Sequence, residues 1–197
     1  MFAGILSFAA VPASAGEFLH ITNLTFANVP IQRGTVCLTL GGNCSGPGVP
    51  EQGFNGSAGM GWRLAPGGTG LIGPSGYTFN PPSFTGLPFS VASFLQVATY
   101  TFSQTISEFE PGVLYRLSFY LGSRYSGGSY DGNQTVVALI DGRAIGNWAL
   151  ASFKPFTLQS AYFRVETGGT HQLQFAGINS GDHTAFLSGV SIEGIAQ

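Results

Sequence analysis

Charged residues are unusually scarce in this 197-residue chain. Asp, Glu, Lys and Arg make up 8% of its residues, against about 25% in an average globular protein. Only seven residues are Lys or Arg, and Lys154 is the single lysine. Nucleic-acid binding needs many basic side chains to displace counterions from phosphates. The composition therefore argues against a nucleic acid as a partner.

Helical periodicity and long apolar runs are also missing. No segment repeats apolar residues at the spacing of three and four that marks an amphipathic helix. The apolar run from Phe2 to Val11 is shorter than the roughly 20 residues that cross a bilayer, so we expect no transmembrane span. Abundant aromatic residues, 13% of the chain, argue against disorder despite the low charge.

The N-terminal run has two readings. It ends in Ala13-Ser14-Ala15, a triplet of the kind that a signal peptidase cuts after, but no basic residue precedes Arg33. One reading is a secretory leader. The other, which we favour, is a retained N-terminal arm that closes the domain's own core or docks on a neighbouring protein subunit. The strand-like stretch "FLHITNLTF" follows, in which Leu19, Ile21 and, after a break at Asn23, Leu24 and Phe26 are expected to face inward.

Cysteine is scarce, and its two copies lie close together. Cys37 and Cys44 flank Gly41-Gly42, a pair that favours a tight turn. A hairpin here would bring the thiols together, and oxidation would close a small loop. The alternative is a pair of reduced cysteines. A zinc site is not expected, because two further ligands at suitable spacing are missing.

Strand signals recur along the rest of the chain. "VLYRLSFYLGS" alternates apolar residues on one face, and "VVALIDGRAIGNW" is two short strands joined by Asp141-Gly142, a strong two-residue turn signal. "YFRVETGGTHQLQFAG" has the same pattern around Gly168-Gly169, and "TAFLSGVSIEG" supplies a closing strand. Many short strands with regular turns predict an all-β antiparallel β-sandwich or jelly roll. Residues 41–90 hold most of the prolines, and we expect them to form long loops over one end.

Several of these motifs together resemble a known family. "GW…PGGTGLIGPSGYTFN", "FLQ" followed by "SQTI", "LSFYLGSR" and "NSGDHTAFLSGVSI" are similar, in that order, to galactose-binding-like jelly-roll domains of plant cell-wall proteins and of bacterial secreted proteins with a PEP-type sorting signal. The resemblance runs from about Phe54 to Glu193. It divides the chain into an N-terminal arm and hairpin region, 1–50, and a jelly-roll domain, 51–197. It implies a non-catalytic protein associated with polysaccharide surfaces.

Two departures from that family concern metal binding. Domains of this superfamily often hold a structural calcium with carboxylates of the terminal strand. The family's ending usually carries acidic residues just before the last valine, where this chain has Ser188 and Gly189. We therefore expect no metal and no cofactor.

Catalytic motifs are not found. There is no G-x-S-x-G elbow and no H-E-x-x-H pair, and Lys154 does not stand in a phosphate loop. His183 beside Asp182 invites a hydrolytic interpretation, but no matching nucleophile or paired carboxylate accompanies them. We expect a turn before the last strand at this place, and no enzyme activity.

Sugar recognition has a different signature, namely aromatic plates for pyranose rings and planar polar groups for hydroxyls. The segment "SRYSGGSYDGNQT" offers several such side chains in one loop, and the long Gly/Pro-rich region offers two more rings. The plainer alternatives are loop anchors for the two tyrosines of this segment and a core position for the tryptophan. The candidate ligand-binding residues are Arg124, Tyr125, Tyr130, Asp131, Asn133, Gln134, Trp62 and Tyr77.

These observations favour a non-enzymatic binding or adhesion module of the jelly-roll type on an extracellular or particle surface. It would attach to glycans or to a neighbouring protein. The alternative is a structural virion protein, such as a capsid decoration or tail component, with residues 1–15 as an assembly arm. A hydrolase is a third class, which the missing motifs disfavour.

Overall fold

The computed structural model describes residues 16–22, 24–26, 36–38, 44–45, 61–64, 69–73, 81–95, 101–125 and 130–195. These residues form β-strands and loops, with no helix among them, and hence no helix able to span a membrane. The strands are β1 (Val36–Leu38), β2 (Cys44–Ser45), β3 (Arg63–Leu64), β4 (Thr69–Ile72), β5 (Ala92–Leu95), β6 (Thr101–Phe109), β7 (Leu114–Ser123), β8 (Thr135–Ile140), β9 (Arg143–Ala149), β10 (Thr157–Phe163), β11 (Gly169–Gly177) and β12 (Ala185–Ile195).

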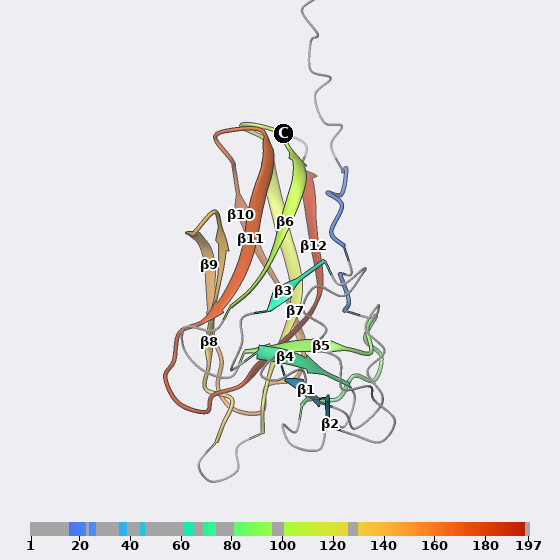
Figure 1. Ribbon diagram of the computed structural model, residues 1–197, viewed down its shortest axis with the longest axis vertical. Helices are drawn as coiled ribbons and strands as arrows, with labels where there is room; N and C mark the ends of the chain where they lie inside the picture. The colour runs from blue at the N-terminus through green and yellow to red at the C-terminus, as the bar shows by residue number, and fades with distance from the viewer. Residues whose placement is uncertain are drawn as a thin grey trace, which may run out of the picture.

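The strands make two antiparallel sheets that pack face to face (Figure 1). One sheet has seven strands in the order β10-β7-β12-β5-β4-β1-β2, and the other has five in the order β3-β6-β11-β8-β9. Neighbours in each sheet are mostly distant in sequence, as β7 and β12 are. This arrangement confirms the predicted all-β sandwich of the jelly-roll type.

Alternation in the sequence decides which side chains enter the space between the sheets. In β7 the residues Tyr115, Leu117, Phe119 and Leu121 are buried, as their period of two predicts. Phe119 of β7 and four aromatic rings from other segments form a cluster that fills the centre of this core. Its rings lie 5.0–6.3 Å apart and belong to Phe26, Trp62, Phe102, Phe119 and Phe175.

A second, smaller apolar cluster lies on the other face of the seven-stranded sheet. Phe84, Phe89 and Phe156 pack there against one another, with ring centroids 5.1–5.7 Å apart. They cover side chains of the strands below, including Phe94 and Phe186, both fully buried. The segment from 81 to 91 is thus a cover over part of this sheet, and the strands β4 and β5 are buried on both faces.

The segment from 16 to 26 runs beside β12 and links the two sheets. Phe18 forms an isolated bridge with Glu193, and Thr22 exchanges two hydrogen bonds of 2.8 Å with the Gln104 side chain on β6. Ile21 and Phe26 are buried as predicted, whereas Leu24 is 45% exposed because a turn interrupts the segment. Residues 1–15, the predicted arm, lie outside the described residues.

Two of the predicted hairpins are present. Strands β8 and β9 are joined by Asp141-Gly142, with φ of 49° and 79°, as a type I′ turn requires. Strands β1 and β2 place Cys37 directly opposite Cys44. The cysteine side chains lie outside the described part of the chain, so their oxidation state stays a prediction.

The expected hairpin around Gly168-Gly169 is wrong. Strand β10 pairs with β7 in the seven-stranded sheet, and β11 pairs with β6 and β8 in the other. Gly168 therefore lies in a connection that crosses from one sheet to the other, and Gly169 begins β11. A local turn signal does not distinguish this crossing from a hairpin, because either connection needs a sharp reversal with a permissive residue.

The β8–β9 turn is tied to β11 by its own side chain. Asp141 accepts a 2.8 Å hydrogen bond from the Gln172 backbone N–H and lies 2.5 Å from Nδ1 of His171, whose Nε2 lies 2.8 Å from the Thr167 carbonyl. Both ring nitrogens therefore face acceptors, which suits an imidazolium. Asp141 raises the pKa of His171 above its ordinary 6.5. The Gln172 N–H, and then His171, lower the pKa of Asp141.

This pairing predicts a pH-dependent stability. Because the pKa of His171 is higher in the folded state, its contribution is complete below pH 6.5 and is lost as the pH rises through the folded-state value. Asp141 contributes above its unfolded pKa of 3.8 and loses that contribution as the pH falls below it. Urea unfolding between pH 6 and 9 should show a decline in the wild type that His171→Gln flattens. An unchanged slope in His171→Gln would contradict the pairing, and His20→Gln, at an exposed position, is the control.

Candidate functional site

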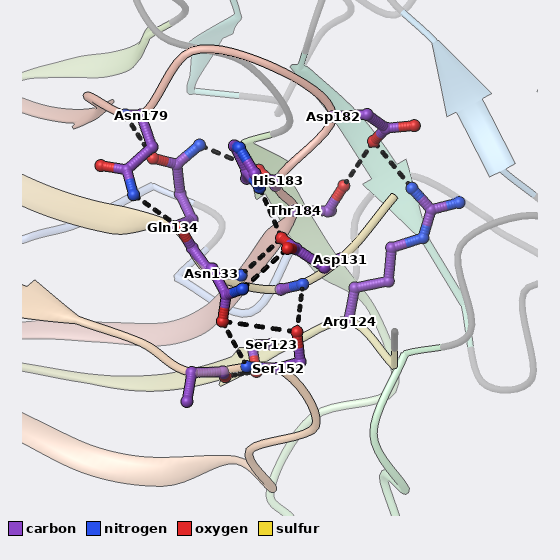
Figure 2. A network of polar contacts seen from close by, with 12 residues as sticks. Ser123, Arg124, Asp131, Asn133, Gln134, Ser152, Asn179, Asp182, His183 and Thr184 are labelled. Atoms are coloured by element: carbon purple, nitrogen blue, oxygen red, sulfur yellow. Dashed lines mark hydrogen bonds and ion pairs between the residues drawn. The ribbon is translucent and has the colours of Figure 1, made fainter. Parts of the chain in front are cut away.

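Four of the candidate residues, Arg124, Asp131, Asn133 and Gln134, lie together where β7 ends and β8 begins (Figure 2). They meet the turn that precedes β12 and the loop that follows β9. Of the two rings predicted elsewhere, Trp62 is 2% exposed within the core, and Tyr77 lies outside the described residues.

Arg124 is a buried anchor between two loops. It is 3% exposed, and its Nη1 donates a 2.8 Å hydrogen bond to Oδ1 of Asp182. The ring of Tyr130 lies against the same guanidinium, 3.9 Å from Cζ to the ring centroid, a cation–π contact. Burial lowers the pKa of Arg124 and Asp182 opposes that shift. This position supports the loops, and direct contact between Arg124 and a ligand stays a prediction.

Asp131 and His183 form a second link between the same loops. They pair in an isolated parallel bridge, and Oδ1 of Asp131 lies 2.5 Å from Nδ1 of His183. Burial would raise the pKa of Asp131, but hydrogen bonds from His183 and Asn133 outweigh it and lower the pKa overall. Among the described residues, no hydroxyl or thiol is hydrogen-bonded to the His183 ring. The pair joins the two loops at the turn that the sequence predicts before the last strand.

Gln134 is fully buried and fixes the strand end beneath these loops. Its Nε2 donates a 2.9 Å hydrogen bond to the His183 carbonyl. Its Oε1 accepts from the backbone N–H groups of Ile178 and Asn179, at 3.1 and 2.8 Å. The Gln134 amide thus joins the backbone after β11 to the turn before β12, and the Ile178 N–H also donates to the Thr135 carbonyl at 3.1 Å.

The loop from 150 to 154 is hydrogen-bonded at nearly every residue. Ser152 accepts a 3.1 Å bond from the Gly132 N–H at its Oγ, and its own N–H donates to Oδ1 of Asn133 at 2.9 Å. Ser123 donates from Oγ to the Ala151 carbonyl and accepts from the Lys154 N–H, at 2.6 and 2.8 Å. These hydrogen bonds hold the loop in its observed conformation.

That conformation presents a strained aromatic residue to solvent. Phe153 is 61% exposed and has a φ of 56°. Bulky residues rarely adopt the left-handed region, and doing so costs about 1–3 kcal/mol. The Phe153 N–H donates a 2.8 Å hydrogen bond to the Arg124 carbonyl, which holds the backbone in this state. The strained backbone and the exposed ring together mark Phe153 as a candidate ligand contact.

Tyr125 completes an exposed aromatic pair. It is 53% exposed, and its ring lies 5.1 Å from that of Phe153 with planes at 82°. We call Tyr125 and Phe153 the aromatic corner. Asn133, also exposed, reaches the same loop through Ser152. Sequence reasoning identified Tyr125 and Asn133 as candidates but missed Phe153. The available signal was an aromatic residue in "ASFKP", a short segment between two strands with no strand face to bury it.

The resembled family implies a calcium ion that the residues here do not fit. Ser188 is fully buried, and its Oγ donates a 2.8 Å hydrogen bond to the Val91 carbonyl. Gly189 has no side-chain oxygen and takes a φ of 63° beside an irregularity in β12. Among the described residues, no three His, Cys, Asp or Glu side chains gather into a site for a metal ion.

Comparisons with known proteins give information about the fold. No protein-family model matches the chain, and no curated protein matches it. A Stig cyclase from Fischerella sp. TAU, solved in complex with (3Z)-3-(1-methyl-2-pyrrolidinylidene)-3H-indole, is 11% identical with a TM-score of 0.63, over 92% of this chain and 100% of that chain.

Two carbohydrate-binding proteins are similar at lower scores. The CBM22-1–GH10 modules of Clostridium thermocellum xylanase 10B, complexed with xylohexaose, are 14% identical with a TM-score of 0.47, over 70% of this chain and 26% of that chain. A CBM36 module in complex with calcium and xylotriose is 19% identical with a TM-score of 0.43, over 66% of this chain and 91% of that chain. Identities this low show a shared fold alone, and the two lower scores carry no argument about function.

The Arg124 anchor leads to a stability prediction. Arg124→Ala should lower the free energy of unfolding by about 2 kcal/mol or more, because it removes a buried charge from its pair with Asp182. The loss should be smaller than that of a fully buried pair, since the Asp182 side chain is 36% exposed.

Arg143→Ala is the matched control for this change. It breaks a 3.9 Å pair with Glu166 in which both side chains are more than four-fifths exposed, so it should cost under about 1 kcal/mol. Denaturant unfolding of both variants is the measurement. Equal losses in the two would contradict an anchoring role for Arg124.

Proposed function

We propose that this domain is a non-catalytic module that binds glycans at the aromatic corner, on an extracellular or particle surface. The observation that carries the proposal is Phe153, an exposed ring on a strained and fully hydrogen-bonded loop. A fold has no stability reason to keep such a residue, because Asn or Gly would adopt the same backbone at lower cost. A ligand that uses the ring supplies the reason.

The chemistry around the corner suits a sugar. An aromatic ring covers the apolar face of a pyranose, and planar amides bind its hydroxyls. Asn133 donates from Nδ2 to Oδ2 of Asp131, and the second N–H of this nitrogen is available to a hydroxyl, whereas its Oδ1 already accepts from both the N–H and the Oγ of Ser152. Hydrogen bonds hold the Asn133 side chain, and the Phe153 ring packs against Tyr125. Both are therefore in place before a ligand arrives, and little side-chain entropy would be lost on binding.

The absence of turnover is part of the proposal. No hydroxyl or thiol among the described residues is hydrogen-bonded to the His183 ring, and the joining of two loops accounts for the Asp131–His183 pair. The alternative of a structural virion protein depends on residues 1–15, which lie outside the described residues. The aromatic corner favours a sugar ligand independently of that arm.

Phe153→Asn tests the proposal without disturbing the fold. Asn tolerates a left-handed backbone, so this variant should keep or raise the melting temperature while it removes the ring. We expect affinity for the best ligand on a glycan array to fall at least tenfold, a loss of about 1.4 kcal/mol. Tyr125→Ala should weaken binding in the same direction, as truncation of an aromatic contact usually does.

Leu158→Ala is the control, because Leu158 is as exposed as Phe153 but lies on β10. It should leave glycan affinity unchanged. Full affinity in both Phe153→Asn and Tyr125→Ala would exclude the aromatic corner as the binding site. Product formation from a bound glycan that stops on His183→Ala would show an enzyme instead.

A further inference from the structure

A row of four side chains crosses the seven-stranded sheet near its opposite end. Tyr162 on β10 pairs with Arg116 on β7, and Arg116 pairs with Glu193 on β12. Glu193 in turn lies opposite Phe18 in an antiparallel bridge. Residues directly opposite one another in antiparallel strands point to the same face of the sheet. We call these four residues the aromatic row.

The row is open to solvent and has an aromatic ring at each end. Tyr162 is 57% exposed and Phe18 is 62% exposed. The backbones of these two residues are three strand spacings apart, about 14 Å. Arg116 and Glu193 form an ion pair between them, with side chains 42% and 19% exposed. The pair raises the pKa of Arg116 and leaves the row with no net charge.

Polar groups and a hollow adjoin the row. The next positions along the same face are serines on all three strands, Ser160, Ser118 and Ser191, which are paired in register. At the other side Tyr162 forms part of the wall of a cleft of about 740 Å³. Arg143, Arg164 and Glu166 also line that cleft, which has the size of a ligand site.

The row lies far from the aromatic corner. Arg116 is near the start of β7, and Arg124 follows its end, eight residues further on. At about 3.3 Å per residue the two places are separated by roughly 26 Å. A single short sugar chain bound at one place does not occupy the other.

We propose that the aromatic row is a second sugar-binding surface, which takes a neutral polysaccharide chain lying across the strands, and that the domain is therefore bivalent. Two rings at the ends would stack on separate sugar units. The Arg116–Glu193 pair and the serines between them would donate to and accept from hydroxyl groups, which do both. The absence of net charge along the row favours a neutral chain over an acidic one. The inference rests on the proposed function for the class of ligand and adds a separate site.

Titration calorimetry with short probes tests the number of sites. Cellotetraose, xylotetraose and mannotetraose, each too short to reach from the row to the corner, are the probes, and we expect the one that binds to give two sites on each wild-type domain. The double variant Phe18→Ala/Tyr162→Ala should retain one site. The corner variant Tyr125→Ala/Phe153→Asn should retain the other. Leu158→Ala, which lies on the same strand and face as Tyr162 but away from the row, should retain both.

The outcomes separate the two proposals. Two sites that persist in the row variant would overturn the second surface and leave the corner standing. A single wild-type site that only the corner variant removes would do the same. A site that only the row variant removes would support the row and reject the corner. Binding of none of the three probes by the wild type would reject both surfaces as sites for neutral chains.

Bivalency has a separate readout. The wild type should aggregate the soluble polymer of the sugar that binds and raise the turbidity of the mixture, since each domain joins two chains. Either double variant should bind without aggregating. Circular dichroism and melting curves of both variants establish that they remain folded. Aggregation by the row variant at wild-type strength would overturn the second surface.

Discussion

The loop end of this sandwich depends on one buried amide. Gln134 has no exposed surface, and its two polar atoms join the start of β8 to the turn before β12. The backbone around it leaves no room for alternatives: a Cβ on Gly177 would stand 3.0 Å from the Gln134 side chain, and one on Gly132 would stand 2.5 Å from the Arg124 carbonyl. Once these positions are set, the neighbouring salt bridge, Asp–His pair and serine bonds have little freedom. The exposed aromatic corner therefore depends on the packing of buried residues beneath it.

The two proposed surfaces are built in different ways. At the corner, hydrogen bonds from several loops hold a strained ring in place. At the row, the register of neighbouring strands aligns Tyr162, Arg116 and Glu193, and an isolated bridge to Glu193 adds Phe18. A surface made by register changes little between free and bound states, because a sheet moves as a unit. A sparsely charged chain of this kind has few means of binding by long-range attraction, so shape and hydroxyl contacts have to supply its selectivity.

Local patterns in the sequence predict the parts of this fold that depend on local physics. The alternation in β7 and the Asp141-Gly142 turn need only neighbouring residues to be understood, and both are confirmed. The connection at Gly168-Gly169 was mistaken for a hairpin because the partners of β10 and β11 lie elsewhere in the chain. Phe153 was missed for the same reason. Its exposure is set by hydrogen bonds to residues about 20 to 30 positions earlier, which no spacing rule contains. Arg124 was named, but the sequence did not reveal its burial against Tyr130 and Asp182.

The cover formed by residues 81–91 divides the seven-stranded sheet into two halves with different tolerance to substitution. Strands β4 and β5 lie between the main core and the Phe84–Phe89–Phe156 cluster, so a polar residue would be buried on either face. Strand β10, at the sheet's edge, keeps one face open. Substitutions to polar residues should therefore be tolerated less well in the covered half of the sheet than in the open half. A new binding specificity could arise on the open half without a cost to folding.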